Sequence, residues 1–117
     1  MPSTYAIRDL LRGRVPAGSP VQVQGWVRTR RDSKAGISLI HLHDGSCFDP
    51  IQVVASGELP NYQNEVLKLS TGCALRCTGK LVESQGKGQA FEIQADGIHV
   101  DGWVDGSSTS RTFPGIF

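Results

Sequence analysis

The sequence has 117 residues, of which 38% are hydrophobic and 20% charged, a composition typical of one folded domain that argues against wholesale disorder. The formal net charge is only +1, but residues 1–34 contain seven Lys or Arg and two acids, whereas the remaining residues contain five and nine. This asymmetry is compatible with one basic face that meets a polyanion.

Residues 1–20 form a lead-in to the domain that we predict over residues 21–104. They lack the apolar run of a signal peptide, and no stretch approaches the length of a membrane span, so we expect a cytoplasmic domain with no membrane partner. Ile7, Leu10 and Leu11 fall on one side of a possible helical turn, which glycines and prolines then break. We expect a short turn or strand that covers the base of the fold.

A long first strand starts at Val21. Its two parities differ, with valines on one and larger or polar residues on the other: Val21, Val23 and Val27 against Gln22, Gln24, Trp26, Arg28 and Arg30. Gly25 interrupts the strand where it can bend sharply to serve two sheets of a barrel.

The second and third strands lie within residues 37–44 and 50–55, after turns at 33–36 and 44–46. Alternation predicts an apolar inner face made of Ile40, Leu42, Ile51, Val53 and Ala55. His41, His43 and Gln52 have the opposite parity and are expected to face outward.

A helix is expected after Asn61, because Tyr62, Val66 and Leu69 recur at i, i+4 and i+7 and Asn61 can cap the free amides. Two more strands follow, with the apolar faces Cys73, Leu75, Cys77 and Leu81, and then Phe91, Ile93 and Ala95. A hairpin turn at 84–89 joins them, and 105–117 is a flexible tail, a linker or an added artificial sequence.

The order of three strands, a helix and two strands predicts an all-β fold, a five-stranded OB-fold barrel with one helix between strands three and four. The second and third strands of this fold, with its connecting loops, bind oligonucleotides. A single helix excludes a doubly wound α/β fold.

Two features of the chain suit nucleic acid. The segment from Trp26 to Lys34 places an aromatic ring beside four cations, and guanidinium groups pair with phosphates and stack on bases. Gln52 carries an amide that donates and accepts at once, as reading a base edge requires. The alternatives are a solvated basic edge strand that discourages aggregation, and an ordinary surface glutamine.

Metal binding and catalysis find little support in the sequence. His41, His43, Asp44 and Cys47 lack the second spaced pair of ligands that a closed zinc site needs, so no metal is expected. No nucleophile with its base, carboxylate pair or ATP motif is evident, so we expect no catalysis and no cofactor in this chain alone. The odd number of cysteines, three, suits a reducing compartment.

The run Gly25–Asp32 resembles the start of the anticodon-binding domain of the aspartyl-, asparaginyl- and lysyl-tRNA synthetases. Further segments resemble the bacterial asparaginyl-tRNA synthetases in particular: Ser46–Val53, Leu59–Tyr62, Thr78–Lys80 and Phe91–Ala95. The similarity covers about residues 21–104. It implies an OB-fold that grips the tRNA anticodon loop and favours uracil at its centre.

The resemblance also assigns roles to single residues. It implies that Arg31 contacts the anticodon, that Gln52 reads the central base, and that Gln94 helps to separate the third base. We expect the other cations of residues 28–34 chiefly to position the RNA backbone. The full set of candidate nucleic-acid-binding residues is Arg28, Arg30, Arg31, Lys34, Leu39, His41, Gln52, Lys80 and Gln94.

The chain departs from the family at two points. Leu39 stands where the family has a base-stacking phenylalanine, so we expect weaker or less selective RNA binding unless His41 substitutes. The catalytic domain is absent from these residues, and with it the need for ATP and magnesium. We therefore expect either a fragment of an asparagine–tRNA ligase, whose catalytic domain would be a partner, or a free-standing domain that binds without aminoacylating.

Two other functions remain open. One is a sequence-tolerant single-strand-binding module, which needs several exposed aromatics where only Trp26 and Phe48 are candidates. The other is a free-standing protein-interaction domain derived from a synthetase.

Overall fold

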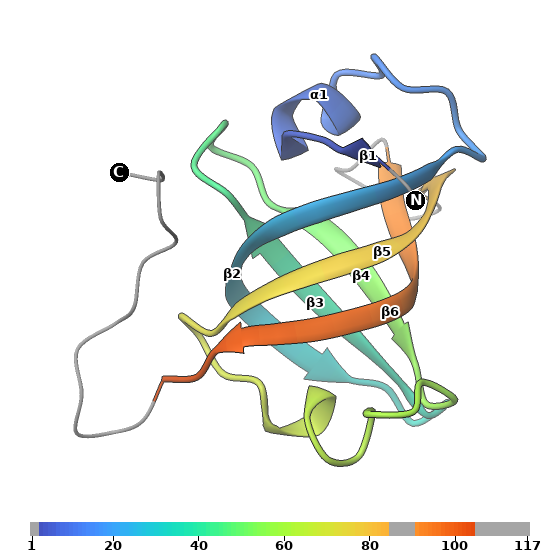
Figure 1. Ribbon diagram of the computed structural model, residues 1–117. Helices are drawn as coiled ribbons and strands as arrows, with labels where there is room; N and C mark the ends of the chain where they lie inside the picture. Colours follow the sequence, from blue (N-terminus) through green and yellow to red (C-terminus); the bar gives the residue numbers. More distant parts are fainter. Residues whose placement is uncertain (1–2, 85–90, 105–117) are drawn as a thin grey trace.

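Five strands curl into a closed barrel in the computed structural model, which describes residues 3–84 and 91–104 (Figure 1). They are β2 (Pro20–Asp32), β3 (Ile37–His43), β4 (Ile51–Ser56), β5 (Ala74–Glu83) and β6 (Phe91–Gly102). The sheet order is β1-β2-β3-β4-β6-β5, and an additional β2–β5 pairing closes it. The predicted OB-fold barrel is confirmed. Apart from Ser84, the hairpin turn expected at 84–89 lies outside the described residues, as does the tail at 105–117.

The alternation predicted for the barrel interior is confirmed in β3, β4 and β5. The apolar residues expected to face inward are buried: Ile40, Leu42, Ile51, Val53, Ala55, Cys73, Leu75, Cys77 and Leu81. In β6, Ile93 is fully buried, whereas Phe91 and Ala95 are half-buried against the same core. The opposite parity of these strands therefore makes up the outer surface of the barrel.

Gly25 lies where β2 changes its partner. The first half of β2 pairs with β5 as far as Trp26, and from Trp26 onward the strand pairs with β3. A Cβ atom at Gly25 would collide with the carbonyl oxygen of His43. Only glycine allows this close approach, which confirms that β2 serves two parts of the barrel.

A β-bulge in β2 overturns one sequence prediction. The register shifts between Val27 and Thr29, so that Arg28 is an extra residue without a partner on β3. Beyond the bulge Arg30 pairs with the buried Ile40 and points to the inner side, whereas Arg31 points outward. The prediction that Trp26, Arg28 and Arg30 share one face is therefore wrong for Arg30.

The lead-in covers one end of the barrel with both a strand and a helix (Figure 1). β1 (Ser3–Thr4) runs parallel to β2, and α1 (Ile7–Leu11) follows it. The helix buries Ile7 and Leu10 completely. Its first two amides, those of Ile7 and Arg8, donate to the side chains of Asp44 and Ser46, at 3.0 Å each. We expected only a turn or strand here.

The helix predicted after Asn61 forms only a single 3-10 turn, η1 (Val66–Lys68), after a series of turns. The Asn61 side chain does not cap a helix but donates to the Glu65 carboxylate and to the carbonyl of Ile98, at 2.7 and 2.8 Å. Tyr62, Val66 and Leu69 are nevertheless buried. Their spacing thus reported burial at the second end of the barrel correctly, but not helicity.

Within the described ranges, no helix is long and apolar enough to cross a membrane.

Candidate nucleic-acid interface

Outward side chains on consecutive strands form a row around the barrel that contains four of the predicted site residues. Through successive strand pairings the row is Arg31, Leu39, Val54, Gln94 and Lys80. Arg31 and Leu39 are direct partners, with Gln94 two strands further on. Lys80 lies on β5, which passes in front of β3 and β4 in Figure 1, so it is on a different wall from Leu39.

A second row lies beside the first and centres on Gln52. Its members are Thr29, His41, Gln52, Glu92 and Val82. The side-chain oxygen of Gln52 lies 3.3 Å from Nε2 of His41, and its amide nitrogen donates to Oε1 of Glu92 at 3.1 Å. Gln52 is therefore held from both sides on the outer face, with its oxygen toward β3 and its nitrogen toward β6.

Glu92 is a member of this site that sequence reasoning missed. Its outward parity was visible in the alternation of the last strand, where Glu92 lies between the apolar residues Phe91 and Ile93. Its contact with Gln52 depends on the parallel pairing of β4 with β6, which brings together residues 40 positions apart. Local alternation carries no signal for that pairing.

A hollow of about 260 Å³ lies at the end of the first row. It is lined by Arg31, Asp32, Ser33 and Leu39. Arg31 is exposed and Leu39 half-buried, so a cation and an apolar surface meet at one concave point. Lys34, which follows Ser33 in the sequence, is exposed in the turn but does not line this hollow.

Arg30 is half-buried and engaged by other groups of the protein, and it does not share this face. Its guanidinium donates to both carboxylate oxygens of Asp32, at 2.8 and 2.7 Å, and through Nε to the carbonyl of Leu69 at 2.9 Å. Asp32 also accepts from the buried hydroxyl of Ser38, which lies 2.9 Å from that of Tyr62. These groups stabilise one end of the barrel, and a role of Arg30 in nucleic-acid binding stays a prediction.

The face continues past the second row toward the loop between β3 and β4. Trp26 pairs with His43 there, with ring centroids 5.7 Å apart, but Trp26 is only 6% exposed. Burial of His43, and then the charge of Arg28, lower its pKa, against an opposing effect of Asp44. The imidazole of His43 is therefore neutral near pH 7. Arg28 is exposed at the bulge.

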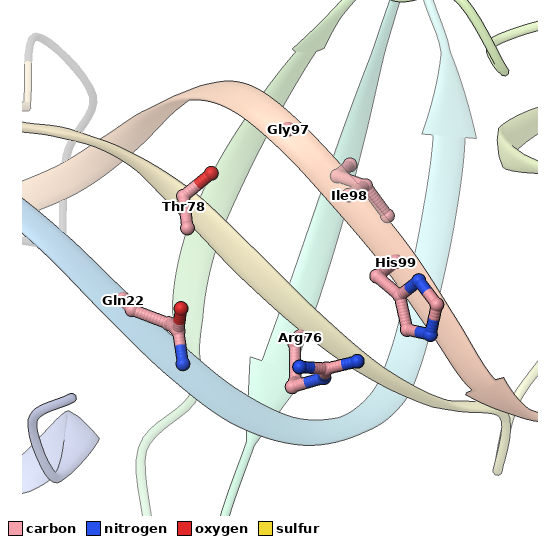
Figure 2. Close-up of a pocket in the computed structure, with 6 residues that line it drawn as sticks. All are labelled: Gln22, Arg76, Thr78, Gly97, Ile98 and His99. Atoms are coloured by element: carbon pink, nitrogen blue, oxygen red, sulfur yellow. The ribbon is translucent and has the colours of Figure 1, made fainter. Parts of the chain in front are cut away.

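A second hollow, of about 310 Å³, lies on the wall formed by β2, β5 and β6 (Figure 2). It is lined by Gln22, Arg76, Thr78, Gly97, Ile98 and His99. Asp101 accepts from Nε of Arg76, at 3.2 and 3.3 Å, and lies 3.3 Å from His99. The cation of this hollow is thus already paired with a carboxylate, and none of the predicted site residues lines it.

The described residues contain no group of three or more His, Cys, Asp or Glu that could hold a metal ion. Cys73 and Cys77 are buried in the core, as predicted. Burial, with a smaller effect of Asp96, raises the pKa of Cys77 to about 12.

Comparison with known proteins places the chain among nucleic-acid-binding domains. The family model for the OB-fold nucleic acid binding domain, named tRNA_anti-codon, matches residues 21–101. Asparagine–tRNA ligase of Idiomarina loihiensis is 62% identical over 112 residues, which are 96% of this chain and 24% of that protein. The ligase of Sodalis glossinidius is 58% identical over 107 residues, which are 92% and 23%. The chain thus spans about a quarter of the length of these curated relatives.

Solved structures show the same fold. Entamoeba histolytica asparaginyl-tRNA synthetase, in complex with asparaginyl-adenylate, aligns with a TM-score of 0.73 at 22% identity, over 90% of this chain and 25% of that one. The Pyrococcus horikoshii enzyme in the same kind of complex gives 0.74 at 15% identity, over 86% and 22%.

Proposed function

Because the chain belongs to the family of OB-fold nucleic acid binding domains, we propose that it binds the anticodon loop of a transfer RNA as part of an asparagine–tRNA ligase. The observation that carries this proposal is the row of His41, Gln52 and Glu92 on the outer face of β3, β4 and β6. An amide fixed in orientation suits the reading of one base edge.

The neighbouring row supports the same reading. Arg31 offers an exposed guanidinium beside the half-buried Leu39, whereas the guanidinium of Arg30 is engaged by a carboxylate. A guanidinium suits phosphate or a base edge, and the hollow at Leu39 offers an apolar support for a splayed base. Gln94 lies two strands further along this row, where a third base can be contacted.

The curated relatives support a proposal for the reaction of the whole protein. We propose that a catalytic domain beyond these residues attaches asparagine to its tRNA in the cytoplasm, using ATP and magnesium. The present chain supplies binding and not chemistry, so those cofactors belong to the catalytic domain.

The test is a titration of the chain with an asparagine anticodon stem-loop and with a variant in which the central U is replaced by C. We expect tighter binding of the first RNA, and loss of this preference in Gln52→Ala. Gln24→Ala is the matched control, because Gln24 projects from β2 beside Arg76 of β5, away from the β3–β4 face. Indifference of the wild type to the central base would overturn the proposal.

The same titration separates the other functions. Equal affinity for oligo(dT) and for the stem-loop would identify a sequence-tolerant single-strand-binding module. Binding of the stem-loop should weaken with salt, because phosphate contacts release counterions. An interaction that ignores salt would favour a protein partner.

A further inference from the structure

The proposed anticodon face does not end at Gln52. On β3 the outward positions are Leu39, His41 and His43, so the alternate residues span about 14 Å at the usual rise of an antiparallel strand. Beyond His43 the chain enters the loop of residues 44–50, which presents Phe48. This aromatic side chain is 89% exposed.

The base of this loop is anchored. One carboxylate oxygen of Asp44 accepts from the amide of Ile7, and the other from the amide and hydroxyl of Ser46. The Ser46 hydroxyl oxygen in turn accepts from the amide of Arg8. The start of the loop is thereby held against α1, and Phe48 lies two residues beyond this anchor. Burying a phenylalanine ring would gain free energy that this arrangement leaves unused.

Arg28 joins this loop to the face. The bulge places it outward, and its guanidinium donates to the backbone carbonyl of Phe48 over 3.5 Å, a weak bond that leaves other N–H groups available. Arg28 is also close enough to lower the pKa of His43. A cation thus contacts the backbone of the residue that carries the exposed aromatic ring, close to the last outward residue of β3. Asp49 follows Phe48 and opposes an anion, so stacking is the main attraction here.

We propose that Phe48 and Arg28 form a separate subsite that takes a nucleotide flanking the anticodon triplet. The base stacks on the Phe48 ring, and Arg28 contacts the adjoining phosphate. This inference rests on the proposed function, because it extends the same RNA past the three outward positions of β3, Leu39, His41 and His43. It also gives the domain an aromatic platform that Leu39 does not supply at the other end of the face.

The experiment is a binding cycle that combines protein and RNA changes. The proteins are the wild type, Phe48→Ala, Phe48→Tyr and Phe48→Leu, and the RNAs are the asparagine anticodon stem-loop and versions with one abasic nucleotide on either side of the triplet. His99→Ala is the remote control, since His99 lies on the wall shown in Figure 2.

Phe48→Ala should weaken binding of the intact stem-loop about 5- to 150-fold, the range expected for the loss of one stacked base. Phe48→Tyr should retain the affinity, Phe48→Leu should lose most of it, and His99→Ala should change nothing. One of the two abasic RNAs should bind the wild type as weakly as Phe48→Ala binds the intact RNA, with no further loss when both changes are combined. The preference for the central U should persist throughout.

Three results would overturn the subsite. The first is wild-type affinity in Phe48→Ala, which would leave this aromatic for a protein partner. The second is additive loss with both abasic RNAs, and the third is full affinity in Phe48→Leu. In each case the proposed function stands if the wild type still prefers the central U. A wild type that does not bind the stem-loop overturns both.

Discussion

Gln52 on β4 and Glu92 on β6 are 40 residues apart in the sequence, yet they are partners across a parallel ladder and share a 3.1 Å hydrogen bond. The bond occupies the donor side of the amide, while His41 lies against its oxygen. Turning the amide over would set its NH₂ group against the ring and its oxygen against a carboxylate. Glu92 therefore fixes the orientation of the Gln52 amide, with its oxygen toward β3 and its nitrogen toward β6.

Replacing Glu92 with Ala should reduce base discrimination more than affinity. Without this hydrogen bond the Gln52 amide can rotate by half a turn. Its oxygen then accepts where its nitrogen formerly donated, so Gln52 can hydrogen-bond to either U or C. One hydrogen bond contributes about 1 kcal/mol, so the preference for U should fall about fivefold. Stem-loop titrations with U and C at the centre measure this preference, and Glu92→Gln, which keeps an acceptor, is the control. An unchanged preference in Glu92→Ala would contradict the positioning role.

Leu39→Phe should strengthen binding of the anticodon stem-loop. The side chain borders a hollow of about 260 Å³, so a ring can be accommodated without overpacking the core. Stacking on an aromatic contributes roughly 1–3 kcal/mol per base, which a leucine does not provide. Isothermal titration of both proteins with the same RNA measures the gain. Equal affinity would show that Leu39, or His41 beside it, already supports the base.

Arg31 and Arg30 are adjacent in sequence, but replacing Arg31 should affect RNA binding, whereas replacing Arg30 should affect stability. Arg31→Ala should weaken RNA binding and reduce the salt slope by roughly 0.7 for one lost phosphate contact on single-stranded RNA, with no change in stability. Arg30→Ala should lower the free energy of unfolding by about 1 to 2 kcal/mol, because the Leu69 carbonyl loses the Arg30 donor and Asp32 keeps only the Ser38 hydroxyl. Urea unfolding and salt-dependent titration of both variants separate the two effects. Similar results for the pair would contradict the placement of the bulge.

The barrel and its inward face were predictable because alternation has a short period, and each strand reports its own buried side. The turn at Gly36 and the close approach at Gly25 also carry local signals. The bulge at Arg28 does not. One inserted residue reverses the parity of everything after it, and only the pairing with β3 shows where it lies.

Contacts between distant strands escaped prediction for a related reason. Glu92 reaches Gln52 only because β6 runs parallel to β4, and this pairing depends on the topology of the whole closed barrel. The spacing of Tyr62, Val66 and Leu69 was equally correct about burial, but Asn61 and its neighbours favour turns over helix. The periodicity identified the buried side chains of this segment but did not predict its backbone conformation.

Alkaline pH should destabilise the barrel through Cys77. Burial raises the pKa of this thiol from an ordinary value of 9.0 to about 12. Between these values the unfolded chain loses the proton and the folded chain keeps it, so the unfolded state binds fewer protons and the free energy of unfolding falls as pH rises, by up to about 1.4 kcal/mol per pH unit. Urea unfolding of the wild type and of Cys77→Val between pH 8 and 11 measures this slope. Titrations of other groups are common to both proteins, so the wild type should show the steeper fall, and parallel profiles would contradict the assignment. Below pH 9 a thiol reagent should label the half-buried Cys47 and reach Cys77 only on unfolding.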